Sequence, residues 1–263
     1  MHWNTGTMGF SYADWQKIFY PEGTRPTDYL ATYASAFDSL ELDTTFHACP
    51  SAERVQKWTD AVPDHFTFCV KTPKAITHDA PIAFGTPAMR HFLRVLTPMR
   101  AAQKLGCVLI QFPPTFPASE IGNLESFLKD LPTDLRFAVE FRHPSWEMKR
   151  TAELLTHYRI CWTTGDYGVD PFPIHPTAPF LYLRLIGVHE QFGKHDRERI
   201  DMTDRLEWWL EQVDALAARV DTIYLYANND YAGHSPATIR RVRKLLNLPA
   251  PTPAPIRPQN SLF

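Results

Sequence analysis

The stretch RFAVEFRHPSW, residues 136–146, shows the pattern that decides the fold. Successive side chains of a β-strand face opposite sides, so Val139 and Phe141 share one side while Ala138 and Glu140 share the other. One side is bulky and apolar, whereas the other ends in a carboxylate. We therefore predict a buried strand over Arg136–Phe141 that presents a polar side chain at its carboxyl end.

This alternation recurs along the chain, and nearly every strand-like run is followed by a helical pattern. Strands that alternate with helices indicate parallel pairing through crossovers, and the length of 263 residues is close to the roughly 250 of a (β/α)8 barrel. We predict an α/β protein with a TIM (β/α)8 barrel as its single domain. An open doubly wound sheet is the alternative, but no Gly-rich turn follows the first run. The eight runs are His2–Thr7, Ser39–Asp43, Phe66–Lys71, Cys107–Phe112, Arg136–Phe141, Ile160–Thr164, Phe180–Ile186 and Thr222–Ala227.

The predicted barrel domain covers residues 1–248, and a proline-rich tail follows at residues 249–263. Small residues alternate with proline in the tail, which favours an extended or disordered segment. Helical patterns occupy residues 27–37, 51–61, 87–105, 119–130, 145–158, 203–219 and 235–246. The connection Gly165–Pro179 has four prolines and no helical pattern, so we expect an irregular loop there.

Six of the strands end in a polar side chain on the side opposite the apolar one. The carboxyl ends of barrel strands form one mouth, where barrel enzymes carry their active sites. Because a buried charge without a partner is costly, these side chains must either pair or bind something. A salt-bridge cluster that closes the top of the barrel is the structural alternative. The six residues are Glu41, Lys71, Gln111, Glu140, Arg184 and Asn228.

Within this predicted mouth we assign roles by side-chain chemistry. A carboxylate beside a histidine offers a general base and acid, so Glu41, Glu140 and His143 are the catalytic candidates. Cations and amides hold an anion, so the predicted substrate-binding residues are Lys71, Gln111, Arg142, Arg184, Asn228 and Asn229. Lys71 has three possible roles, as an anion binder, a Schiff-base amine or a structural ion-pair partner.

We predict no metal site and no cofactor. Lys71 and Arg184 stand where further metal ligands would be needed, and the cysteines Cys49, Cys69, Cys107 and Cys161 show no metal-binding spacing. These cysteines are expected to be buried, reduced thiols. No signal-peptide pattern and no apolar run of about 18 residues is present, so we expect a cytoplasmic protein without a membrane partner.

Seven motifs along the chain are distinctive: Gly6–Trp15, Glu41–Phe46, Phe68–Lys71, Leu109–Pro114, Val139–Trp146, Tyr182–Leu185 and Tyr226–Asn229. Together they resemble the motifs of the YecE-like family, also called domain of unknown function 72. The resemblance implies a (β/α)8 barrel related to the xylose isomerase and endonuclease IV group, and it implies no particular activity. His47 departs from the family pattern, in which tyrosine is common.

Three functions remain open from the sequence. The first is an enzyme, a hydrolase, lyase or isomerase, that acts on a small anionic molecule such as a sugar phosphate. The second is a nucleic-acid protein that acts on a phosphodiester, as the likeness to endonuclease IV suggests. The third is a binding protein without chemistry. The net charge of −2 favours a small anionic partner over nucleic acid, and the sequence does not specify an oligomeric state.

Overall fold

The strands and helices alternate as predicted. The computed structural model describes residues 1–79, 81–82, 85–169 and 173–253. The strands are β1 (His2–Thr7), β2 (Ser39–Leu42), β3 (Thr67–Lys71), β4 (Leu105–Gln111), β5 (Phe137–Glu140), β6 (Cys161–Trp162), β7 (Thr164–Asp166), β8 (Phe180–Leu185) and β9 (Thr222–Ala227). The helices are α1 (Tyr29–Ala34), α2 (Ala52–Asp60), α3 (Lys74–Thr77), α4 (Gly85–Val95), α5 (Thr97–Ala101), α6 (Ile121–Lys129), α7 (Lys149–His157), α8 (Thr203–Asp214), α9 (Asn229–Ala232) and α10 (Ser235–Leu245).

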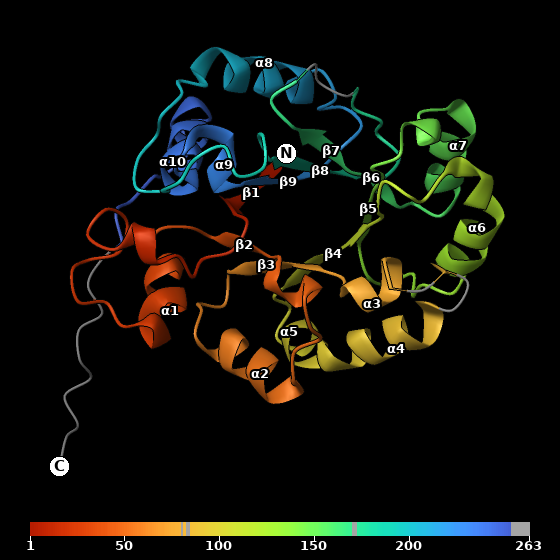
Figure 1. Cartoon of the computed structure of the whole chain (residues 1–263), viewed down its shortest axis with the longest axis horizontal. Helices are drawn as coiled ribbons and strands as arrows, with labels where there is room; N and C mark the ends of the chain where they lie inside the picture. The colour runs from red at the N-terminus through yellow and green to blue at the C-terminus, as the bar shows by residue number, and fades with distance from the viewer. Residues whose placement is uncertain (80, 83–84, 170–172, 254–263) are drawn as a thin grey trace.

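All strand pairs are parallel and form two sheets. The order is β1-β9-β8-β7 in the four-stranded sheet and β2-β3-β4-β5-β6 in the five-stranded sheet. Figure 1 shows the strands of both sheets in the middle of the molecule, with the longer helices around them. The prediction of parallel strands joined by helical crossovers is confirmed. The predicted single closed ring of hydrogen-bonded strands is not what the described residues show.

The division into two sheets comes from the predicted sixth strand, which breaks at Thr163. Among the described strands β6 pairs only with β5, and the Thr163 N–H still donates to the Val139 carbonyl at 2.8 Å. β7 then pairs with β8. The chain therefore changes partner within one extended run, and Gly165, predicted to open a loop, lies in β7 instead.

At the other junction, β1 and β2 come together around a buried tyrosine. The Tyr33 hydroxyl accepts from the Thr7 N–H at 2.8 Å and donates to the Ser39 carbonyl at 3.0 Å. An isolated parallel bridge joins Met8 to Glu41 just beyond these residues. The backbones of β1 and β2 are thus linked through Tyr33 of α1 and one bridge, although the described residues form no ladder between the two strands.

The predicted two-sidedness of the strands is confirmed by two separate apolar clusters. Leu40, Val70, Ile110, Val139 and Leu183 pack in the large cluster under the helices. The opposite side forms the interior cluster, to which strands of both sheets contribute. This cluster contains Cys69, Cys107 and Cys161, which are buried free thiols as expected. Cys49 lies outside the cluster and is exposed, contrary to expectation. The interior cluster consists of Met8, Cys69, Cys107, Leu109, Ala138, Cys161, Ala178, Phe180, Tyr182, Tyr224 and Tyr226.

The start of the proline-rich tail is tied to α10. The Leu248 N–H donates to the Arg243 carbonyl at 2.8 Å, and the Arg243 guanidinium donates to the Pro249 carbonyl. Residues 254–263 lie outside the described residues, so the tail boundary stays a prediction. None of the described helices is both long and apolar enough to cross a membrane.

The junction of β1 and β2 generates a stability prediction. A Cβ added at Gly6 would lie 2.0 Å from the Ser39 carbonyl oxygen, which is backbone and cannot easily move. We expect Gly6→Ala to lower the free energy of unfolding by about 1–3 kcal/mol, measured by urea denaturation. Gly122→Ala is the matched control, because that glycine is exposed in α6 with no atom within 4 Å of the new Cβ. It should stabilise the chain by up to about 1 kcal/mol. Equal effects of the two substitutions would show that β1 and β2 are not held this closely.

Candidate functional site

Arg184, at the carboxyl end of β8, joins the two predicted catalytic carboxylates. Its Nε and Nη2 donate to the two oxygens of Glu41 at 3.1 and 2.7 Å. Its Nη1 donates to Glu140 at 2.6 Å. All three residues are at most 4% exposed. The Tyr182 hydroxyl also donates to Glu41 at 2.8 Å. This arginine clamp brings β2, β5 and β8 together, as the predicted mouth requires.

Glu140 is the most strongly charge-stabilised carboxylate of the clamp. Besides Arg184, it accepts from the Arg142 guanidinium and from the Tyr167 hydroxyl at 2.7 Å. Burial alone would raise its pKa, but the charges of Arg184, Arg142 and Lys71 outweigh burial and hold the pKa at about 2. Glu140 is therefore an ionised carboxylate at neutral pH and a weak proton acceptor.

Lys71 ends β3 beside the clamp and is held differently. Its Nζ donates to Gln111 Oε1 at 2.7 Å and lies 4.0 Å from the centre of the Phe46 ring. Among the described residues, no carboxylate oxygen lies within ion-pair distance, 4.0 Å, of this ammonium group. Burial and the neighbouring charge of Arg184 lower the pKa of Lys71 to about 8, although Glu140 and Glu41 act in the other direction.

Asp43 is a third carboxyl group near the clamp, and sequence reasoning did not assign it a role. Burial and the charge of Glu41 raise its pKa, whereas Arg184 and Lys71 act to lower it. Asp43 lies two residues after Glu41, so both side chains face the same side of the predicted strand. This spacing was the sequence signal that could have identified Asp43. Three carboxyl groups thus accompany the three cations Lys71, Arg142 and Arg184. Because Asp43 has a raised pKa, proton uptake there would leave the cations in excess.

A pocket of about 190 Å³ opens beside Glu140 at the end of β5. Arg142 lines it, with 28% of its side chain exposed and its guanidinium stacked 4.5 Å from the Tyr167 ring centre. His143 also lines the pocket, and its Nδ1 accepts from the Ser145 N–H at 3.2 Å. Trp146, Trp162 and Phe141 supply aromatic walls. The pocket combines one accessible cation with flat apolar surface.

Asn228 and Asn229 do not join the clamp in the way the sequence suggested. The Asn228 side chain accepts from the Asp230 N–H at 3.2 Å and caps α9. Asn229 is buried, and its Oδ1 accepts from Trp15 Nε1 and from the Ser235 N–H. Strand alternation no longer applies after β9 has ended, so these carbonyl groups satisfy backbone and indole donors instead. Their contacts are structural.

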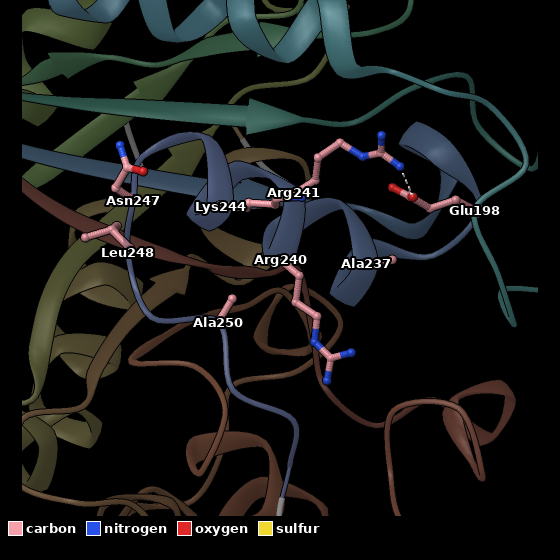
Figure 2. A pocket seen from close by; sticks show the side chains of 8 residues that line it. All are labelled: Glu198, Ala237, Arg240, Arg241, Lys244, Asn247, Leu248 and Ala250. Carbon is pink, nitrogen blue, oxygen red and sulfur yellow. Dashed lines mark hydrogen bonds and ion pairs between the residues drawn. The ribbon is translucent and has the colours of Figure 1, made fainter.

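The larger pocket, about 700 Å³, lies away from the clamp on the outer side of α10. Figure 2 shows Arg241 paired with Glu198, while Arg240 points in another direction. Arg243 of the same helix is 6% exposed and pairs with Asp38 at 2.9 Å. Among the described residues, no group of three or more His, Cys, Asp or Glu side chains is placed to hold a metal ion.

The fold and the clamp define the class of the protein as a parallel α/β protein with a buried ionic cluster at the carboxyl ends of its strands. The chain belongs to the DUF72 family of proteins of unknown function, whose family model matches residues 4–261. The resemblance to the YecE-like family is thereby confirmed. Among relatives, the UPF0759 protein YecE of Escherichia coli K12 is 35% identical over 154 residues, which are 57% of this chain and 55% of the relative.

Further relatives agree with this assignment. The UPF0759 protein YunF of Bacillus subtilis is 33% identical over 48% of this chain and 47% of its own. The chain thus spans about half the length of the curated relatives it matches. The crystal structure of a DUF72 family protein from Thermotoga maritima has 30% identity and a TM-score of 0.80, and covers 94% of this chain and 100% of its own. A DUF72 family structure from Enterococcus faecalis, 21% identical with a TM-score of 0.77 over 97% of this chain and 99% of its own, shows the same fold.

The depressed pKa of Glu140 generates a prediction for acid stability. A carboxyl group whose pKa falls from 4.5 to about 2 on folding stabilises the folded state above pH 4.5, and this contribution is lost as the pH falls toward 2. We expect the free energy of unfolding to fall by up to about 3 kcal/mol over that range from this group. In Glu140→Gln this part of the pH dependence should vanish, whereas exposed Glu153→Gln should keep it. If the free energy of unfolding depended on pH in the same way in Glu140→Gln and in the unmodified chain, the low pKa assigned to Glu140 would be contradicted.

Proposed function

We propose that the protein is an enzyme that acts on a small anionic molecule by proton transfer at the carboxyl ends of its strands. The single observation that carries this proposal is the pairing of charges around Glu140, which itself lines the pocket. Arg184 is fully engaged by two carboxylates, whereas Lys71 has no carboxylate within ion-pair distance among the described residues. A cluster with a purely structural role would be expected to pair each buried charge.

We also propose that the two sheets work as one (β/α)8 barrel. Counting β6 and β7 as one interrupted strand leaves eight strands. The bridge from Met8 to Glu41 joins the sheets at one side, and the single residue Thr163 joins them at the other. The interior cluster, with side chains from both sheets, supports this proposal. The site would then occupy the end of the barrel that enzymes with this fold use.

The proposed roles differ from those assigned by sequence reasoning. Arg184 donates hydrogen bonds to both Glu41 and Glu140, so we assign all three to positioning and to the electrostatic field of the site. Lys71 is the better proton-transfer group, because a pKa of about 8 is close to neutral pH whereas a pKa of about 2 is not. Arg142 lines the pocket and would bind the anionic group of the substrate.

Gln111 and His143 support these groups. Gln111 fixes the Lys71 Nζ through its 2.7 Å hydrogen bond. The Nδ1 of His143 is occupied by the Ser145 backbone, so Nε2 is the ring nitrogen left to act on a substrate in the pocket. The aromatic walls would contact the apolar part of the molecule.

The proposal predicts that sulfate binds through Lys71 and Arg142. Because sulfate does not titrate near neutral pH, its affinity reports on the protein alone. We expect Lys71→Met and Arg142→Ala each to weaken binding about tenfold or more in calorimetry, since a charged hydrogen bond contributes about 1.5–3 kcal/mol. The protonated amine binds the anion, so affinity should fall as the pH rises through about 8.

Two comparisons control this measurement. In Lys71→Met the affinity should no longer change between pH 7 and 9. Arg241→Ala should bind sulfate as the unmodified chain does, because Arg241 lies at the outer pocket and is paired with Glu198. Equal affinity of all three variants, or no sulfate binding at all, would leave the clamp as a structural element and exclude the proposed anion site.

A further inference from the structure

We propose that Lys71 is a nucleophilic amine that forms a covalent imine with a small aldehyde or ketone bearing a carboxylate or phosphate group. The inference rests on the proposed function, because Arg142 would bind the same anionic group. It goes further by naming the reacting atom, Lys71 Nζ, and the carbonyl class of the substrate.

The contacts of Lys71 leave its amine available in a way that those of another buried lysine do not. Within the described part of the chain, Lys71 Nζ has one hydrogen-bond acceptor, Gln111, and lies over one aromatic ring, Phe46. Lys104 is buried to a similar extent, but its Nζ donates to the Thr59 and Val62 carbonyls at 2.9 and 2.8 Å. The Nζ of Lys104 is therefore held by two backbone carbonyl groups. The Nζ of Lys71 would have to break only its hydrogen bond to the neutral amide of Gln111 in order to react.

The surroundings of Lys71 favour the neutral amine that attack on a carbonyl needs. A lysine becomes nucleophilic near neutral pH when it is desolvated or lies beside another cation. Lys71 meets both conditions, because it is 9% exposed and the positive charge of Arg184 acts on it. A pKa of about 8 leaves roughly a tenth of the amine unprotonated at pH 7.

The proposed step balances without an oxidant or reductant. The lone pair of neutral Nζ forms a bond to the carbonyl carbon, the C=O π electrons move to oxygen, and a proton passes from the nitrogen to that oxygen to give a carbinolamine. A second proton, supplied by an acid, lets the oxygen leave as water while the nitrogen lone pair forms the C=N bond of a protonated imine. Asp43, whose pKa is raised by burial and by the charge of Glu41, is the candidate proton donor. Gln111 is a positioning residue for Nζ.

The chemistry of the pocket lined by Glu140 and Arg142 limits the substrate class. A pocket of about 190 Å³ accommodates only a small molecule, and Arg142 is the cation that lines it. The Arg142 guanidinium can bind a carboxylate or a phosphate through two parallel hydrogen bonds. A small 2-oxo acid or a short phosphorylated aldehyde fits these requirements.

The proposal is tested by reductive trapping on the full-length chain. Glyoxylate, which has an aldehyde and a carboxylate, is added with sodium cyanoborohydride, and the modified lysines are identified by peptide mass mapping. We expect Lys71 to be modified at least about tenfold faster than Lys104 and the exposed Lys149, which serve as internal controls. The rate at Lys71 should rise as the pH increases through about 8, because the neutral amine reacts.

Propanal has no anionic group, so comparing it with glyoxylate separates the reactivity of the Lys71 amine from the binding of the carboxylate by Arg142. Arg142→Ala should slow modification of Lys71 by glyoxylate without changing its modification by propanal. Modification of Lys71 no faster than that of Lys149 overturns the imine proposal. If sulfate still binds through Lys71 in that case, the proposed anion site survives and only the covalent step is wrong. If sulfate does not bind either, the proposed function fails as well.

Discussion

The guanidinium of Arg184, shared between Glu41 and Glu140, is the interaction on which the rest of the site depends. Moving a single charge into a protein interior costs several kcal/mol, and here three charged groups are buried together. Their burial is tolerable because each carboxylate accepts a charged hydrogen bond from the same arginine. Glu41 belongs to β2, Glu140 to β5 and Arg184 to β8, so the clamp also fixes strands of the two sheets relative to one another.

The clamp divides the polar residues into a structural and a reactive group. Arg184 donates from all three of its nitrogens to carboxylates, so it has little capacity left for a ligand. Its charge nevertheless acts on Lys71, where it opposes protonation of the amine. The same field lowers the pKa of Glu140 and thereby removes that residue from general-base chemistry. Burial and the charge of Arg184 thus make Lys71, and not Glu140, the group that titrates near neutral pH.

Strand alternation predicted most of this arrangement from the sequence. It separated the apolar side from the interior side correctly in β2–β5, β8 and β9, and it placed Glu41, Lys71, Gln111, Glu140 and Arg184 on the same interior side. It could not predict which cation pairs with which carboxylate, because that depends on distances between strands. Asp43 and Tyr182 carried the same alternation signal, whereas Tyr167 follows β7 in a segment expected to be a loop.

The errors arose where alternation ends or is interrupted. Asn229 follows the last residue of β9 by two positions, and the turn into α9 directs its side chain to Trp15 and Ser235. The break at Thr163 left no clear mark, since residues on both sides remain extended and buried. Short elements such as α3 and α9 were also missed, because four residues are too few to show a helical period.

The most direct test of the clamp is a thermodynamic cycle between Arg184 and its two carboxylates, measured by urea denaturation at pH 7. Arg184→Met should lower the free energy of unfolding by about 3–5 kcal/mol, because Glu41 and Glu140 are left buried with less compensation. Adding Glu41→Gln and Glu140→Gln to that variant should recover much of the loss, since the buried charges are then removed together. A loss below about 1 kcal/mol for Arg184→Met, or strictly additive effects of the three substitutions, would contradict the central role of this arginine.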